Sequence, residues 1–351
     1  MVEVQRLVHC ERRGVGLNSS KRHPSKEDDI VRTSAKVGES SQTRAARNKR
    51  QNWPHSVQSF LMVDDGYVGF AIDLGQAENR IVAYYGNIVN MINAFEQGWD
   101  VHSLTATGIW PDLTWQQIKA EDEEKIACKL GNGTHTRRYF GKRSNHALNY
   151  DLGYRAYALQ LEIPEKESKM IYDGYHNLYP GVKNTFHRKV RDQLRSGRVV
   201  TNLLGRKTPF LGKLDNNLFK EAYACIPQGT VGDIINSRGL TYIYENPDLF
   251  APVELLNQVH DEIVFQIPGP WHPDHPCSWE QIAFMITMIK NSLEVPLQAS
   301  GREFTIPADV TVFKRFKCGS DPKFSEDLDT FAFNIEKAWD KCDEKERKRL
   351  A

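Results

Sequence analysis

Three consecutive polar residues, His260, Asp261 and Glu262, separate two short apolar runs in the last third of the chain. The runs, 255–259 and 263–267, are rich in β-branched and aromatic residues, which predicts two strands with the polar triplet at the bend between them. Adjacent carboxylates between buried strands are costly unless something binds them, and a divalent cation is one such partner. The alternative is an ordinary surface hairpin with a charged tip, so the cation hypothesis needs a second carboxylate elsewhere.

A second strand is predicted at 67–72, and Asp73 ends it. An Asp-Gly turn signal precedes the strand, and we expect 59–63 to pair with it as a hairpin. After Asp73, the segment 76–85 has the spacing of apolar residues that predicts a helix.

Basic and ring-bearing residues recur every four positions in the segment 137–154, which we expect to be helical. At ~100° per residue each step of four drifts by only ~40°, so these residues share one broad face. The basic residues of such a face could bind an anion, and the ring-bearing residues that follow could lie against a planar ring. The alternative is a solvated basic face with its aromatic residues turned inward. The residues are Arg138, Lys142, His146 and Tyr150.

The remaining pattern predicts mostly helices. We expect helices at 89–97, after Asp100 as N-cap, at 112–130, at 164–194 with a break at Tyr179-Pro180, at 215–245 and at 279–293. We also expect a hairpin at 197–210, a last strand at 304–312, and a charged, fraying tail at 336–350.

Composition is that of an ordinary globular chain: 351 residues, 40% hydrophobic, 26% charged and a net charge of +1. The length predicts two or three domains, or one with an insertion. The six cysteines show no CxxC pair, which indicates reduced thiols in a cytoplasmic compartment. No run approaches the ~20 apolar residues of a membrane span. Basic residues outnumber acids over 129–220, which favours a polyphosphate or nucleic-acid partner. The histidines and cysteine of 272–277 are too loosely spaced to favour a zinc site.

Three segments in this order resemble motifs A, B and C of family A DNA polymerases. Asp73-Leu-Gly-Gln-Ala-Glu-Asn-Arg80 resembles motif A, the stripe from Arg138 to Tyr150 resembles motif B, and Gln258-Val-His-Asp-Glu262 matches motif C. Shorter matches are Asp100-Val-His102, Thr201 with Gly205-Arg206, Gln228-Gly-Thr230 with Asp233, Arg32-Thr-Ser34 and Gln51-Asn-Trp-Pro54. The resemblance covers roughly residues 32–315.

The resemblance implies an α+β right-hand fold with an antiparallel palm sheet and a helical fingers insertion, and it implies no thumb or exonuclease domain in this chain. We expect a basic, flexible segment at 1–31, palm at 32–85, fingers at 86–220 and palm again at 221–351. The missing domains suggest a split or truncated polymerase with a separate chain carrying the thumb and exonuclease.

The resemblance also implies a two-metal mechanism in which two Mg²⁺ ions, replaceable by Mn²⁺, promote transfer of dNMP from dNTP to a primer 3′-hydroxyl. The implied metal ligands are Asp73, the carbonyl of Leu74 and Asp261, with Glu262 in support and Lys142 as a proton donor. The implied dNTP contacts are Gln76, Glu78, His102, Arg138, Lys142, His146 and Tyr150. The implied DNA contacts are Arg32, Arg206, Gln228 and His260.

The chain departs from the family pattern at several positions. His146 stands where the family has Phe or Tyr, and Asp151 stands where glycine is usual. Leu74 and Gly75 replace Tyr and Ser. No departure removes an implied metal ligand, so we expect activity.

Two rival functions stay open at this point: a single-subunit RNA polymerase, which Glu78 and Glu262 disfavour, and a non-catalytic DNA-binding subunit. The expected partners are primer-template DNA and dNTPs, with no membrane. The expected location is the cytoplasm, that of the host if the protein is phage-encoded.

Overall fold

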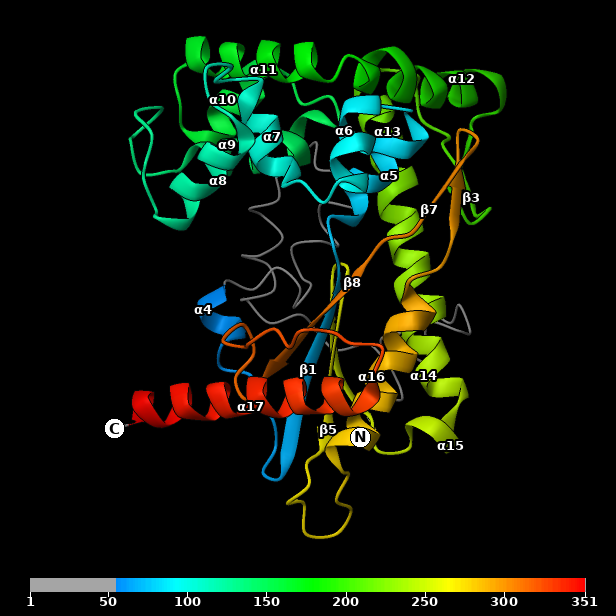
Figure 1. The fold of residues 1–351 in the computed structure, drawn as a ribbon. Helices are drawn as coiled ribbons and strands as arrows, with labels where there is room; N and C mark the ends of the chain where they lie inside the picture. The colour runs from blue at the N-terminus through cyan, green and yellow to red at the C-terminus, as the bar shows by residue number, and fades with distance from the viewer. Residues whose placement is uncertain (1–54, 351) are drawn as a thin grey trace, which may run out of the picture. The chain divides into compact units, whose positions relative to one another are not determined.

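The structure, a computed structural model, describes residues 55–350. The predicted DNA contact of Arg32 and the motif-like blocks at 32–34 and 51–54 lie outside the described residues. The described chain forms two compact units, and Figure 1 labels most of their helices and strands. Unit 1 comprises residues 55–73, 243–288 and 309–350, and unit 2 comprises residues 74–242 and 289–308.

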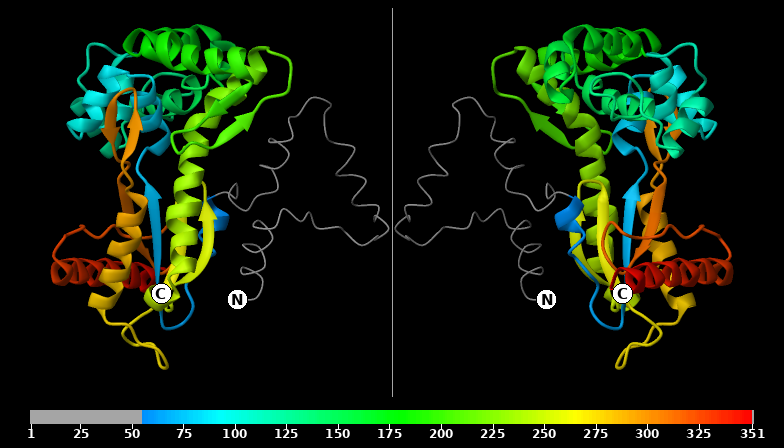
Figure 2. Two further views of the ribbon diagram at one scale, coloured as in Figure 1. Left: turned by 90° about the vertical axis from the view of Figure 1, so that its right-hand side faces the viewer. Right: turned by 90° about the vertical axis from the view of Figure 1, so that its left-hand side faces the viewer.

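Unit 1 is built on a four-stranded sheet with the strand order β4-β5-β1-β8. β1 pairs with β5 in antiparallel fashion, and β4 and β5 form an antiparallel hairpin, drawn in yellow in Figure 2. The predicted hairpin around Asp261 is therefore confirmed. The strands are β1 (Tyr67–Leu74), β4 (Glu254–Val259), β5 (Glu262–Pro268) and β8 (Ala308–Phe313).

One face of this sheet packs closely because Gly69 has no side chain. A Cβ added at Gly69 would lie 2.5 Å from the side chain of Val63 and 2.6 Å from Phe313. These distances are shorter than real side chains tolerate, so β1 can approach Val63 and Phe313 this closely only with glycine at position 69. The apolar cluster on this part of the sheet consists of Ala71, Val259, Val264, Phe313 and Phe316, with Val63 packed against it.

The end of the chain is an ordered helix, α17 (Leu328–Leu350), so the predicted fraying of 336–350 is wrong. The ring of Trp339 stacks on Trp271 with 5.4 Å between ring centroids. Arg315 also holds α17 through a two-oxygen ion pair with Glu346, at distances of 2.5–3.2 Å. Asp343 likewise forms an ion pair with Lys314, so two acids of this segment attach the helix to the body of unit 1.

Unit 2 is mostly helical. Its helices are α5 (Ala77–Tyr85), α6 (Val89–Glu96), α7 (Val101–Thr107), α8 (Trp115–Glu123), α9 (Arg137–Leu148), α10 (Tyr154–Leu161), α11 (Glu165–Leu178), the π-helical η2 (Val182–His187), α12 (Arg188–Gly197), α13 (Asn216–Asp233) and the π-helical η3 (Ile234–Leu240). Two small hairpins pair β2 (Val199–Thr201) with β3 (Lys207–Pro209), and β6 (Leu297–Ala299) with β7 (Arg302–Phe304).

Four shorter or boundary helices complete the described chain. They are α4 (His55–Gln58), α14 (Thr241–Glu245), α15 (Pro247–Phe250) and α16 (Trp279–Leu293). The predicted helix at 279–293 is confirmed to the residue, and the predicted break at Tyr179-Pro180 falls between α11 and η2.

Several predicted elements are wrong in extent. Residues 59–63 form no strand, because only Met62 makes a bridge, to Arg315. The helix expected over 112–130 is confined to α8, and the last strand starts at Ala308. The helix expected over 137–154 ends at Leu148, which leaves Tyr150 outside it.

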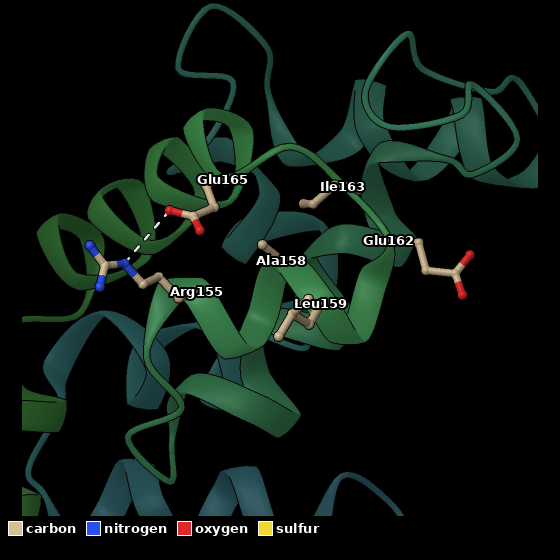
Figure 3. A pocket seen from close by; sticks show the side chains of 6 residues that line it. All are labelled: Arg155, Ala158, Leu159, Glu162, Ile163 and Glu165. Carbon is tan, nitrogen blue, oxygen red and sulfur yellow. Dashed lines mark ion pairs between the residues drawn. The ribbon is translucent and has the colours of Figure 1, made fainter.

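Figure 3 shows the residues that line a pocket on unit 2, among them Arg155 and Glu165, whose ion-paired nitrogen and oxygen are 3.6 Å apart. None of the predicted site residues lines this pocket. Within residues 55–350, no helix is both long and apolar enough to cross a bilayer.

Candidate functional site

Strand pairing in unit 1 brings Asp73 next to the Asp261 hairpin. Asp73 and Glu262 are register partners at the end of the β1–β5 pairing, so their side chains leave the sheet on the same face. Asp261 precedes Glu262 in the two-residue loop between β4 and β5. The other loop residue, His260, has a φ of 55°, the positive value that two-residue hairpin loops require. Carboxylates far apart in sequence therefore share one corner of the sheet.

The electrostatics of this corner oppose ionisation of Asp73. Although the Asp73 side chain is exposed, desolvation and then the negative charges of Asp261 and Glu262 raise its pKa to about 8. The positive charge of Lys317 acts in the opposite direction. Three carboxylates with one lysine leave an excess of negative charge that an additional cation would neutralise.

Lys317 is a member of this corner that sequence reasoning missed. Its ammonium group lies 2.5 Å from a carboxylate oxygen of Glu262 and 4.4 Å from the ring centroid of Phe316. A single lysine beyond the last strand carries no sequence signal of such a role. Because Glu262 is buried and already paired, it is less available to a metal ion than Asp73 and Asp261.

The donor set fits a hard cation that keeps much of its water. Mg²⁺ takes oxygen ligands and is often held by only one or two carboxylates, which Asp73 and Asp261 would provide. Leu74 ends β1 with its side chain fully buried, so only its main chain could face a ligand. In the described part of the chain, no three His, Cys, Asp or Glu residues form a ready-made metal cage, and this includes His272 and its neighbours.

In unit 2, the predicted basic stripe is largely an exposed face. Lys142 and His146 on α9 are exposed, whereas Phe140, Ser144 and Leu148 of the same helix are buried. A solvated basic face is common to both interpretations of the stripe, so the exposure of Lys142 and His146 does not decide between them. The ring of His146 lies 6.3 Å, centroid to centroid, from that of His102 on α7.

Gly141 allows α7 and α9 to meet at His102. A Cβ at Gly141 would lie 2.1 Å from the carbonyl oxygen of His102 and 3.1 Å from the amide nitrogen of Ala106. Both neighbours are helix backbone and cannot move aside as a flexible side chain can. The glycine between Arg138 and Lys142 therefore sets the distance of both residues from His102.

His102 is a buried, neutral ring. Desolvation, then the charges of Arg138 and His146, lower its pKa to about 3, against the opposing charge of Asp100. Its Nδ1 lies 3.1 Å from the amide nitrogen of Asn145. Asn145 is itself hydrogen-bonded to Thr105 at 3.0 Å, so a buried polar chain holds the ring in place.

Arg138 is held by acids on two neighbouring elements. Its Nε and one terminal nitrogen lie 2.7 and 3.0 Å from the two carboxylate oxygens of Asp100, and its other terminal nitrogen lies 3.5 Å from Asp122. Asp100 is the N-cap of α7, as predicted, and accepts a hydrogen bond from the Ser103 amide. Its pairing with Arg138 was not predicted, because it depends on how α7 and α9 pack.

Tyr150 reaches Glu78 although it lies beyond the end of α9. The Tyr150 hydroxyl donates a hydrogen bond to Glu78 in the first turn of α5. Desolvation and the charge of Glu78 raise the pKa of Tyr150 well above its usual value. Gln76, the N-cap of α5, has a φ of 52° and a buried amide oxygen without a partner among the described residues. These three predicted nucleotide contacts thus gather around the start of α5.

The predicted DNA contacts fall in both units. In unit 2, the tip of the β2–β3 hairpin docks on α13, where Arg206 lies 2.8 Å from Asp233 and 3.1 Å from the carbonyl of Gly229. The structure thus joins two motif-like segments, and Gln228 on α13 is exposed beside them. In unit 1, His260 is exposed in the hairpin loop. Their contact with DNA stays a prediction.

The fold is similar to that of a solved polymerase domain. The POL domain of Pol1 from M. smegmatis, in complex with DNA primer-template and dNTP, superimposes with a TM-score of 0.61 at 22% sequence identity. The similarity covers 76% of this chain and 44% of that one. Mixed helices and an antiparallel sheet in this arrangement define a right-hand fold with palm and fingers.

Sequence comparison gives the same result as the structural comparison. Residues 45–303 match DNA polymerase family A, and the chain belongs to that family. It is 25% identical over 288 residues to DNA polymerase I of Helicobacter pylori, covering 78% of this chain and 30% of the relative. It is 28% identical over 214 residues to the DNA polymerase of Mycobacterium phage D29, covering 61% of this chain and 31% of the relative. The chain therefore spans about a third of the length of these relatives.

Proposed function

We propose that the chain carries the palm and fingers functions of a family A DNA polymerase and catalyses template-directed DNA synthesis. The observation that carries the proposal is the corner of the sheet where Asp73 meets Asp261 and Glu262. Family membership supports it, as does the exposed cationic face of α9. In the proposed reaction the primer 3′-hydroxyl loses its proton to solvent water and its oxygen forms a bond to the α-phosphorus of a dNTP. The bond between the α-phosphorus and the oxygen that bridges to the β-phosphate breaks, and pyrophosphate leaves.

Unit 1 would supply the metal-binding part of the site. Asp73 and Asp261 would hold two Mg²⁺ ions, with the main-chain carbonyl of Leu74 as a further ligand. The ions would neutralise charge on the attacking and leaving oxygens. Glu262, held by Lys317, would support the site without direct ligation. We propose palm at 32–85 and 221–351 and fingers at 86–220, as predicted. These ranges differ from the two compact units, because unit 2 also contains 74–85, 221–242 and 289–308.

Unit 2 would supply the nucleotide-binding part. Arg138, Lys142 and the neutral His102 would bind the triphosphate, and Lys142 would protonate the leaving pyrophosphate. His146 and Tyr150 would lie against base and sugar. Glu78, held by Tyr150, would crowd the sugar 2′ position and so disfavour ribonucleotides.

DNA would be the macromolecular partner. Gln228 and His260 would contact minor-groove acceptors that every correct base pair presents in similar places, and Arg206 would be a further DNA contact. A separate chain carrying thumb and exonuclease functions remains part of the proposal. Comparing product lengths with and without such a chain tests that part.

A primer-extension assay with Mg²⁺ tests the proposal. Asp261→Asn should abolish extension while duplex binding stays near wild type, because the change removes one negative charge and no DNA contact. The matched control is Asp340→Asn, which removes the charge of an exposed aspartate on α17. Duplex binding without extension by the wild-type chain would favour the non-catalytic subunit. Preference for NTP over dNTP would favour the RNA polymerase.

A further inference from the structure

Asp100 connects two groups that would bind the triphosphate, although it is not itself among the predicted contacts. Its carboxylate caps α7, which carries His102, by accepting a hydrogen bond of 2.9 Å from the Ser103 amide. The same carboxylate binds Arg138 of α9 through two nitrogens, at 2.7 and 3.0 Å. One partly buried acid therefore fixes the helix that carries His102 and the side chain of Arg138.

The geometry leaves part of Arg138 available. A guanidinium group has five N–H donors in a planar fork. Asp100 takes the side edge of the fork, through Nε and Nη2, and Asp122 takes one donor of Nη1 through a longer contact of 3.5 Å. Two donors remain, one on each terminal nitrogen. Two such donors suit a phosphate group, which arginine binds through paired hydrogen bonds.

We infer that Asp100 is a positioning residue for the nucleotide triphosphate: it orients the fork of Arg138 and fixes α7 so that His102 lies beside it. The inference rests on the proposed function for the identity of the ligand. The physical gain is pre-organisation. An arginine side chain loses much rotamer freedom when it binds, and a chain already held by Asp100 has lost that freedom before the ligand arrives.

The charge of Asp100 has a second effect on triphosphate binding, which opposes the gain from pre-organisation. The negative charge of Asp100 repels a triphosphate, so its removal alone would strengthen binding. Asp100→Asn removes the charge and keeps a good N-cap, because asparagine caps helices as well as aspartate does. Asp100→Glu keeps the charge and moves the carboxylate by one methylene. A positioning role predicts that both variants weaken binding.

The neighbouring ion pair between Arg137 and Glu121 provides the matched control. It has a distance of 2.6 Å and side chains about as exposed as Arg138, and it involves no predicted nucleotide contact. Glu121→Gln therefore removes a comparable pair from α9 without affecting the fork of Arg138. Thermal unfolding of all three variants shows whether any change in binding reflects lost stability.

The experiment titrates the full chain with inorganic tripolyphosphate by calorimetry and with dNTP in single-nucleotide extension. We expect both Asp100 variants to raise the tripolyphosphate dissociation constant and the KM for dNTP roughly tenfold, the order of one charge-assisted hydrogen bond. We expect kcat to change much less, and Glu121→Gln to change KM less than about twofold.

Three results would overturn the inference. One is an equal effect of Glu121→Gln, which would indicate general packing of the helices. Another is tighter binding by Asp100→Asn with no change in Asp100→Glu, which would make Asp100 only a repelling charge. The third is the absence of saturable tripolyphosphate binding by the wild-type chain. Tripolyphosphate binding without extension would contradict the proposed catalysis and leave the positioning role supported.

Discussion

The contact of α7 with α9 predicts that Gly141→Ala destabilises the protein although alanine favours helices. In a helix interior, alanine is better than glycine by about 1 kcal/mol. Against this gain, the new Cβ would lie 2.1 Å from the His102 carbonyl oxygen and 3.1 Å from the Ala106 nitrogen. Over-packing of this kind costs about 1–3 kcal/mol, and more where backbone must move. We therefore expect a net loss of roughly 1–2 kcal/mol in the free energy of unfolding.

Gly232→Ala is the matched control, because Gly232 lies in α13 and a Cβ there would meet nothing within 4 Å. That variant should gain stability, by up to about 1 kcal/mol. Denaturant unfolding of both variants beside wild type measures the two effects. If Gly141→Ala were as stable as Gly232→Ala, the close approach of the helices at His102 would be refuted. A dNTP titration of Gly141→Ala should also show weaker binding, because the helices that carry His102 and Arg138 would move apart.

Two further predictions concern charges in the interior. Lys317→Gln should lower stability by roughly 1–2 kcal/mol, because Glu262 loses its partner in a partly solvated site, and Mg²⁺ should restore part of the loss. Thermal unfolding with and without Mg²⁺ measures this, and an unchanged midpoint would contradict the role of Lys317. His176→Phe should stabilise the chain more at pH 5 than at pH 7.5. Both ring nitrogens of His176 are buried without a partner in the described chain, and desolvation lowers its pKa from 6.5 to about 3. Only the unfolded state takes up this proton as the pH falls below 6.5, so wild-type stability declines there. If denaturant unfolding shows the same stabilisation by His176→Phe at both pH values, this pH dependence is wrong.

Sequence patterns predicted the elements of the site better than the contacts within it. The two apolar runs at 255–259 and 263–267 indicated the β4–β5 hairpin and its polar bend, and the four-residue spacing placed Lys142 and His146 on one exposed face. Both signals are local in sequence. The pairs of Lys317 with Glu262 and of Asp100 with Arg138 depend on packing between distant segments. Neither pair produces a periodic pattern in the sequence, so neither could be predicted from it.

The end of α9 shows how a single residue can override a helical pattern. The spacing continues through Tyr150, yet the helix stops at Leu148 and Asp151 has a φ of 61°. Glycine is usual in the family at this position and adopts such a conformation freely, and aspartate is among the few other residues that tolerate it. Asp151 therefore takes a glycine-like backbone conformation. Tyr150 reaches Glu78 from this turn.

The register of β1 and β5 also has a practical consequence for protein engineering. Side chains alternate between the two faces of a strand, so a residue added to or removed from β5 moves the side chains beyond it to the opposite face. Such a change would turn Glu262 away from Asp73 or expose Val264, whereas a substitution leaves both residues in place. The strands therefore tolerate exchange of similar residues but no insertion. The exposed residues 273–276 in the loop after β5 carry no such register. A tag or fluorophore should be inserted in that loop, where it leaves the spacing between the carboxylates unchanged.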